Sequence, residues 1–319
     1  MMRRRAVFVA LAAPSLARAQ GTARRRIGFV HPITLEPNRT SALNTLRPIW
    51  RRLGYVEGQS VLLRTAAGDP GRLPGIMAEL IALEASVIIA VGAEVVRAAA
   101  AATKSVPVVA IDLETDPVAS GLAHSLARPG GNVTGLFLDQ PALAGKWIEL
   151  LGEVVPGLRR VVLVWDPSTG TAQRDAARSK AEARGYTVET LEWRATPDLE
   201  TAIGGLADGG TGLVQLTAPG FNTVVPRVGP PLLRHRLAML ASLRNYLGSG
   251  ILLSYGPEPK QFWARAMISV ERILAGQSPA ELPIEQPTRF ELALDLNAAK
   301  TIGVTLPFTL LAQADEVIE

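Results

Sequence analysis

The stretch "SVIIAVGAEVVRAAAAATKSVPVVAID", Ser86 to Asp112, decides the fold. Its two ends, "SVIIAVG" and "VPVVAID", are short and almost wholly apolar, which is typical of strands covered on both faces in a parallel sheet. The segment between them, "AEVVRAAAAATKS", has the composition and length of a helix. A strand, a helix and a second strand in this order favour an α/β protein with parallel sheets.

The same alternation continues on both sides of this unit. We expect strands at 27–30, 60–68, 159–167, 186–193, 211–219, 237–243 and 250–256, and helices at 42–53, 73–85, 143–156, 171–185, 198–209, 230–236 and 259–276. The tail over 288–306 predicts one more strand and helix. About ten strands are many for one open sheet, and a seam falls at 131–147, "GNVTGLFLDQPALAGKW". We therefore predict two similar, doubly wound lobes with a ligand cleft between them.

The first twenty residues, "MMRRRAVFVALAAPSLARAQ", form a basic stretch, a short apolar run and an Ala-x-Ala site. This pattern predicts a secretory signal peptide over 1–19, and the alternative is a disordered basic tail. Later in the chain no apolar run approaches the roughly 20 residues of a membrane span.

The composition excludes several classes of function. The chain has 319 residues, 48% of them apolar, and no cysteine, which excludes disulfides, cysteine-bound zinc, iron–sulfur clusters and a thiol nucleophile. Arg3, Arg4, Arg5 and Arg18 lie in the signal segment, and without them the 33 basic residues fall to 29, equal to the 29 acidic ones. A net charge near zero argues against a nucleic-acid partner.

Motifs of catalysis and cofactor binding are not found in this sequence. It has no dinucleotide-binding glycine fingerprint, no P-loop, no Gly-x-Ser-x-Gly elbow and no His-Glu-x-x-His. The three histidines, His31, His124 and His235, are far apart. We therefore expect no catalytic residues, no cofactor and no metal.

Polar and small residues instead follow the carboxyl ends of the predicted strands, where α/β sheets bind ligands. Each of them could also cap a turn or a helix, but a ring of them at one edge is what a small-ligand cleft requires. The candidate ligand-binding residues are His31, Pro32, Gly92, Ala93, Glu94, Asp116, Asp166, Ser168, Thr169, Thr217, Asn222 and Tyr255.

The small-residue stretch "DPVASGLAHSLARPGGNVTG", Asp116 to Gly135, predicts a cleft rim that leads into a hinge. We expect Asp116 at the cleft edge, a short helix over 120–128 with Leu122 and Leu126 facing inward, and a strand over 132–137 that crosses into the second lobe. His124 and Arg128 are expected on the solvated face.

Several blocks of the sequence resemble one family. They are "RRIGFVHP" (25–32), "LGYVEGQSV" (53–61), the stretch from Asp116 to Gly135, "LLSYG" (252–256), "LPIEQPTRFELALDLNAAKTIGVTLP" (282–307) and "LLAQADEVIE" (310–319). In this order they resemble the ABC-transporter substrate-binding proteins of the tryptophan/tyrosine type.

The resemblance implies a type I periplasmic binding fold, with lobe 1 at 24–138 plus 256–288, lobe 2 at 139–255 plus 289–319, and three crossover strands. It also implies a periplasmic monomer that delivers a small solute to an ABC permease and its ATPase, with pocket segments that coincide with the candidate residues above. Two segments depart from the family pattern. The first helix has "LRPIW" (46–50) where the family usually has Phe-x-x-Gly-Leu, and the lobe 2 loop has "APGFN" (218–222) where amino-acid binders tend to have a Thr/Ser-Asp-Asn run. The expected ligand is an amino acid or a related small polar or aromatic metabolite.

Two other functions stay open. An exported two-lobe enzyme of hydrolase or glycosyl-transfer type would need two facing carboxylates, and Asp116 and Asp166 are the pair to consider. A ligand-sensing module of a receptor would need an attached helix or DNA-binding segment, which the sequence does not show.

Overall fold

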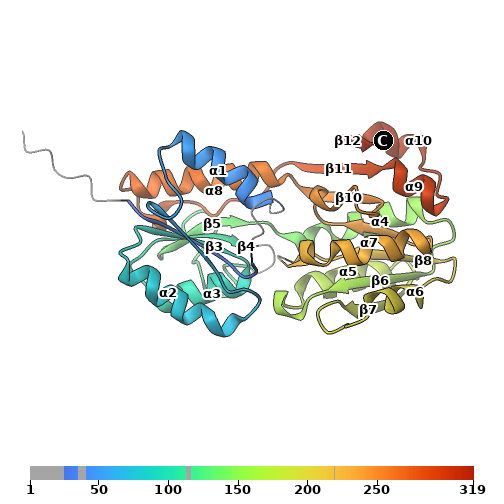
Figure 1. The fold of residues 1–319 in the computed structure, drawn as a ribbon, viewed down its shortest axis with the longest axis horizontal. Helices are drawn as coiled ribbons and strands as arrows, with labels where there is room; N and C mark the ends of the chain where they lie inside the picture. Colours follow the sequence, from blue (N-terminus) through green and yellow to red (C-terminus); the bar gives the residue numbers. More distant parts are fainter. Residues whose placement is uncertain (1–24, 35–40, 113–115, 219) are drawn as a thin grey trace, which may run out of the picture.

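The structure, a computed structural model, describes residues 25–34, 41–112, 116–218 and 220–319. The predicted signal peptide at 1–19 lies outside the described residues. Figure 1 shows two α/β lobes side by side, each built on its own twisted sheet. The prediction of two parallel-sheet lobes is confirmed.

Lobe 1 contains a five-stranded sheet in the order β2-β1-β3-β4-β5, with every neighbouring pair parallel. Its strands are β1 (Ile27–His31), β2 (Val61–Thr65), β3 (Val87–Val91), β4 (Val108–Asp112) and β5 (Val133–Phe137). Its helices are α1 (Ser41–Arg52), α2 (Leu73–Ala82), α3 (Ala93–Ala102) and the late helix α8 (Pro259–Leu274). Helices α1 and α8 cover one face of the sheet, and α2 and α3 cover the other (Figure 1).

Lobe 2 contains a seven-stranded sheet in the order β12-β11-β10-β9-β8-β6-β7. Its strands are β6 (Arg160–Trp165), β7 (Thr187–Glu192), β8 (Thr211–Gln215), β9 (Ala238–Ala241), β10 (Leu253–Pro257), β11 (Phe290–Asp295) and β12 (Glu316–Ile318). Its helices are α4 (Ala144–Val154), α5 (Ala172–Glu182), α6 (Leu199–Gly204), α7 (Val225–Arg234), α9 (Leu296–Ile302) and α10 (Phe308–Gln313).

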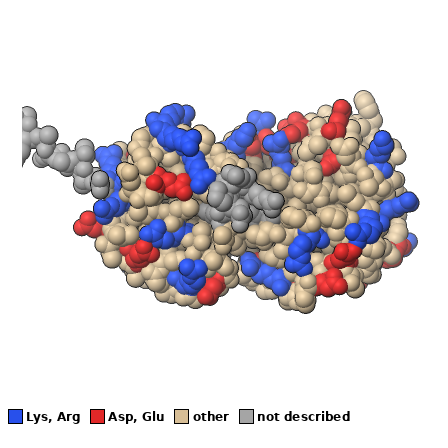
Figure 2. All heavy atoms as spheres, in the orientation of Figure 1, with Lys and Arg blue, Asp and Glu red and all other residues tan. Residues whose placement is uncertain are grey.

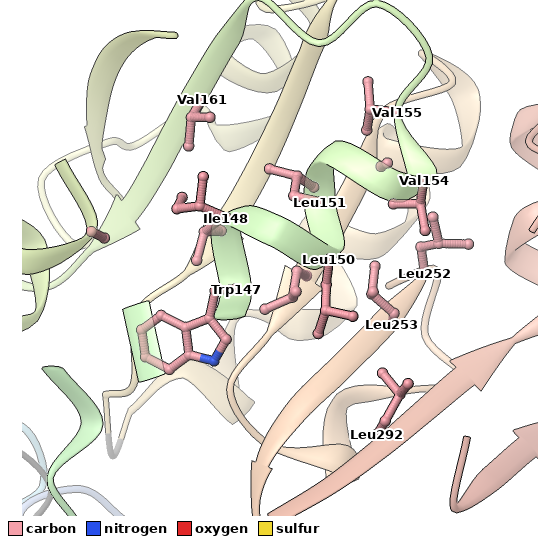
Figure 3. Packing of buried hydrophobic residues seen from close by; sticks show 14 of the residues in the cluster. Trp147, Ile148, Leu150, Leu151, Val154, Val155, Val161, Leu252, Leu253 and Leu292 are labelled. Carbon is pink, nitrogen blue, oxygen red and sulfur yellow. The ribbon is translucent and has the colours of Figure 1, made fainter. Parts of the chain in front are cut away.

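The core of lobe 2 forms around α4. Its apolar side buries Trp147, Ile148, Leu150, Leu151 and Val154 against the strands (Figure 3). Full burial of each large side chain contributes about 1.5–3 kcal/mol, so this helix fixes one face of the sheet. The opposite face packs on α6 and α7.

Three crossings join the lobes: from β5 to α4, from β10 to α8, and through the segment before β11. The last segment lies beside the first, because the Glu285 N–H donates to the Gly135 carbonyl at 2.8 Å. The lobe limits predicted at 138, 256 and 289 fall at these crossings and stay predictions.

One strand pair of lobe 2 departs from the parallel arrangement of the other pairs. Strands β10 and β11 are antiparallel, with Tyr255 opposite Leu292. The chain leaves lobe 2 along β10, passes through α8 on lobe 1 and returns along β11, so the two strands run in opposite directions.

The helix predicted over 120–128 is also wrong, because this segment consists of turns and bends. Gly121 has a φ of +73°, which ends a helical run, and the Asp116 carboxylate accepts the N–H groups of Val118 and Ala119 at 2.8 and 3.1 Å. The predicted directions hold: Leu122 and Leu126 pack inward, whereas His124 and Arg128 are exposed.

Charged side chains of both signs are mixed over the two lobes on the face shown in Figure 2. In the described part of the chain, no helix is long and apolar enough to cross a membrane.

Candidate functional site

The lobes meet at the carboxyl ends of their central strands. Helix α3 of lobe 1 contacts the 3-10 helix η3 (Pro167–Thr169) of lobe 2. Near this contact, a Cβ atom built on Gly220 of lobe 2 would lie 3.3 Å from Cγ2 of Ile33 in lobe 1. Side chains that follow β1, β3, β6, β7 and β8 therefore converge between the lobes.

Asp166 is fully buried at the end of β6. One carboxylate oxygen accepts the Ser168 N–H at 3.0 Å, and the other accepts Nε of Arg194 in an ion pair. Asp166 thus caps η3 and also holds a cation. Removal of one partner from such a pair leaves an uncompensated charge, which costs about 3–5 kcal/mol in buried sites.

Glu94 brings a third charge to this place from the other lobe. It lies in the first turn of α3, where the helix dipole favours an acidic side chain. Burial raises the pKa of Glu94, and the nearby Asp166 carboxylate raises it further, while Arg97 and Arg194 lower it. Glu94, Asp166 and Arg194 therefore form one charged group that spans both lobes.

Two aromatic side chains of the lobe 2 core lie next to this group. The Arg194 guanidinium lies 4.9 Å from the ring centre of Trp193, and Phe221 meets Trp193 edge-on at 5.9 Å. The buried indole N–H of Trp193 has no hydrogen-bond partner in the described part of the chain. Both rings are buried in the core of lobe 2, so they hold the Arg194 guanidinium in place from below.

Trp193 and Arg194 are not among the candidates predicted from the sequence. Arg194 follows the strand predicted at 186–193, so the rule used for the other strands would have found it, whereas Trp193 lies inside that predicted strand.

Thr217 follows β8 and is held from helix α5. The Gln173 side chain accepts the Thr217 N–H at 2.9 Å and donates to its carbonyl at 3.1 Å. The buried hydroxyl of Thr217 has no partner among the described residues. No sequence pattern indicated Gln173, since its partner is 44 residues away.

His31 and Pro32 end β1. His31 is buried, its ring stacks on Phe29 at 6.4 Å, and its Nδ1 accepts the Ile33 N–H at 3.4 Å. Burial lowers the pKa of His31 to about 4, so the imidazole is neutral at neutral pH. The Pro32 carbonyl accepts the Gly68 N–H at 2.8 Å, which makes Pro32 part of a turn.

The other candidates lie around this centre or apart from it. Gly92 caps α3 with a φ of +83° and Ala93 is its first residue, while Thr169 closes η3 through a 2.7 Å hydrogen bond to the Asp166 carbonyl. Asn222 lies in the 3-10 helix Phe221–Thr223. Asp116 is exposed and caps its own turn. Tyr255 stacks on Phe290 at 6.1 Å within lobe 2.

Asp116 and Asp166, the two carboxylates considered for an enzyme, each have partners within the protein. Asp116 is exposed and bonded to backbone N–H groups, whereas Asp166 is buried against Arg194. The described residues contain no cluster of three or more His, Asp or Glu side chains that could hold a metal ion.

A second space between the lobes lies beside the crossings. We call it the hinge-side cavity; its volume is about 350 Å³. It is lined by Asn44, Thr45, Arg244, Asn245, Leu247, Glu258, Pro259, Lys260, Glu291 and Ile318. These residues come from α1 of lobe 1, from lobe 2 and from the start of α8, and none of them was predicted from the sequence.

Known proteins are similar to this chain in sequence and in architecture. A tyrosine-binding protein of Clostridioides difficile strain R20291 is 24% identical over 263 residues, covering 79% of this chain and 73% of the relative. The structure is similar to an ABC domain of Streptococcus pneumoniae in complex with L-Trp, with a TM-score of 0.81, 20% identity, and coverage of 92% of this chain and 99% of the other. A ligand-free, open substrate-binding protein of Clostridium difficile gives a TM-score of 0.64 at 20% identity, with the same coverage.

The two-lobe architecture is that of type I periplasmic binding proteins, as the resemblance implied. The profile of the family "ABC transporter substrate binding protein" matches residues 36–318, which is most of the chain. The chain therefore belongs to the ABC transporter substrate-binding protein family and is a solute-binding protein of such a transporter.

Proposed function

We propose that this protein is exported through cleavage after residue 19, works in the periplasm as a monomer, and captures one small organic solute between its lobes. The solute is an amino acid or a related polar or aromatic metabolite, and it passes unchanged to an ABC permease driven by its ATPase. The name of the tyrosine-binding relative and the L-Trp complex of the similar structure support this ligand class.

The observation that carries the proposal is the charged group formed by Glu94, Asp166 and Arg194. It places both signs of charge between the lobes, and the buried rings of Trp193 and Phe221 support Arg194 from the core of lobe 2. Because Glu94 comes from one lobe and Asp166 and Arg194 from the other, a ligand held here would stabilise the closed arrangement.

Isothermal titration with L-tryptophan, L-tyrosine, other amino acids and small aromatic acids tests this function. We expect at least one of these solutes to bind and to raise the melting temperature as its concentration rises. Asp166→Asn should weaken that binding at least about tenfold, because it removes the charge that orients Arg194.

Asp198→Asn is the matched control. Asp198 also caps a helix of lobe 2, accepting the Thr201 N–H at 3.0 Å, but it is exposed. It should bind the solute as the wild type does. Consumption of a solute by the wild-type protein would show that the protein is an enzyme. If Asp166→Asn bound the solute with wild-type affinity, the charged group would not belong to the binding site.

A further inference from the structure

The end of helix α1 carries arginines that no acidic side chain neutralises. Arg51 and Arg52 lie in its last turn and are exposed, and Arg25, which is also exposed, lies just before β1. Burial raises the pKa of Tyr55 to about 12, and the Arg25 guanidinium opposes this rise, which places Arg25 near the end of α1. The ion pairs of the described residues include none of these three arginines.

Acidic side chains of the same region already have partners. Both carboxylate oxygens of Glu57 accept hydrogen bonds from Arg47, at 2.9 and 3.2 Å, and Glu271 of α8 accepts the Tyr55 hydroxyl at 2.8 Å. An excess of positive charge therefore remains here, although the chain after residue 19 has equal numbers of acidic and basic residues. Figure 2 shows Lys and Arg side chains gathered at the edge of lobe 1 where α1 lies in Figure 1.

Exposed apolar side chains lie directly beside these arginines. Leu53 and Val56, which follow α1, are 38% and 49% exposed, and they are two of the six large hydrophobic side chains that are exposed in the described part of the chain. A cavity of about 260 Å³ adjoins them and is lined by Arg47, Trp50, Arg51, Tyr55, Val56 and Glu57. Apolar groups beside unpaired arginines fit a partner that is anionic at its surface and apolar beneath it.

We propose that the patch formed by Arg25, Arg51, Arg52, Leu53 and Val56 binds the headgroups of anionic phospholipids at a membrane surface. The arginines pair with the phosphate groups, and the cavity beside Arg51 has room for one headgroup. Leu53 and Val56 enter the boundary between headgroups and acyl chains, where a small apolar surface is stabilised.

The patch lies on the side of lobe 1 that is away from the candidate site. Arg25 precedes the amino end of β1, and the patch residues after α1 lead into the amino end of β2, which is parallel to β1. The candidate site instead follows the carboxyl ends of the strands. A membrane bound at the patch therefore leaves that site uncovered, and the inference goes beyond the proposed function.

Co-sedimentation with lipid vesicles tests the inference. The chain from residue 20 onward is used, because the basic and apolar segment before it would itself bind lipid. We expect binding at low salt to phosphatidylcholine vesicles that contain about 30% phosphatidylglycerol, and little binding to phosphatidylcholine alone. Arg51→Gln/Arg52→Gln should weaken the binding at least about tenfold, since each basic side chain near an anionic surface contributes about fivefold. Leu53→Ser/Val56→Ser should weaken it about threefold or more.

Arg184→Gln/Arg236→Gln is the matched control. Both arginines are exposed on lobe 2, and this variant has the same net charge as Arg51→Gln/Arg52→Gln. It should bind the vesicles like the wild type, and all three variants should fold because they change exposed side chains.

The inference would be overturned if the wild type did not bind the anionic vesicles, or if Arg51→Gln/Arg52→Gln bound them equally well. An equal loss in the control would also overturn it, because net charge alone would then explain the binding. Solute titration is a separate measurement, so none of these results decides the proposed function.

Discussion

His31 is a titratable residue that the fold keeps in its neutral form. It is buried at the end of β1 and stacked on Phe29. Burial lowers the pKa of its ring more than the hydrogen bond with the Ile33 backbone raises it. A histidine in such a place does not change its charge in the physiological range, and the neutral ring of His31 packs on Phe29 and accepts the Ile33 N–H of the following turn.

The burial of His31 makes stability depend on pH. Its pKa is about 4 in the folded chain against an ordinary 6.5, so between these values the unfolded chain binds more protons. The free energy of unfolding should therefore be highest above pH 6.5 and fall by up to about 3 kcal/mol as the pH drops toward 4. His31→Gln should lack this part of the pH dependence in urea unfolding at pH 4.5 to 7. The exposed His124→Gln should follow the wild type, and an unchanged slope in His31→Gln would contradict the prediction.

Strand β5 shows how closely two elements can approach at a glycine. Gly135 has a φ of +128°, and a Cβ atom there would lie 2.5 Å from the Ala110 nitrogen of β4 and closer still to its carbonyl oxygen. A side chain at this position must push β5 away from β4, next to the point where the return crossing pairs with β5.

Gly135→Ala should therefore destabilise the protein by about 3 kcal/mol or more, seen as a lower urea midpoint. Gly131→Ala, four residues earlier, is the control, because nothing lies within 4 Å of its Cβ. It should change stability by no more than about 1 kcal/mol. An equal loss of stability in the two variants would contradict the prediction, because it would show that β5 can move away from Ala110 of β4 at little cost in free energy.

The elements with a strong apolar pattern were predictable, and the turns and pairings were not. The strands β3, β4, β6 and β8 and the helices α4 and α8 agree with the predicted ranges. Burial on both faces requires a continuous apolar run in a strand, and burial on one face imposes a helical period on α4 and α8. The direction of β11 depends on a crossing that no local pattern encodes. The predicted helix at 120–128 fails because Gly121 and the Asp116 cap act locally against it.

The site could be predicted as an edge of the sheets but not as a set of partners. The strand-end rule indicated Glu94 and Asp166; the structure pairs Asp166 with Arg194, and the charges of both residues act on the pKa of Glu94. Arg194 itself was predictable by the same rule. Gln173 and the lining of the hinge-side cavity were not, because they depend on contacts between segments far apart in sequence.

The two lobes of the molecule approach each other closely at Ile33 and Gly220. The chain has no cysteine, so a pair introduced there reports on the lobes without interference. Ile33→Cys/Gly220→Cys should form a disulfide under mild oxidation, faster when a bound solute holds the lobes together, as measured by loss of free thiols. Ile33→Cys/Gly209→Cys should not form a disulfide, because Gly209 precedes the amino end of β8, whereas Gly220 follows its carboxyl end. Failure of the first pair to bond with solute present would contradict this contact.

The late position of α8 in the sequence determines when each core can be completed during synthesis. Phe29 of β1 packs on Trp263 of α8 with ring centres 6.0 Å apart, so the first strand made waits for one of the last helices. The seven-stranded sheet likewise waits for β11 and β12. Because a domain folds as a unit once its parts are available, neither half can mature on the ribosome before nearly all of the chain has emerged. For most of its synthesis the nascent polypeptide therefore has no complete core in either lobe.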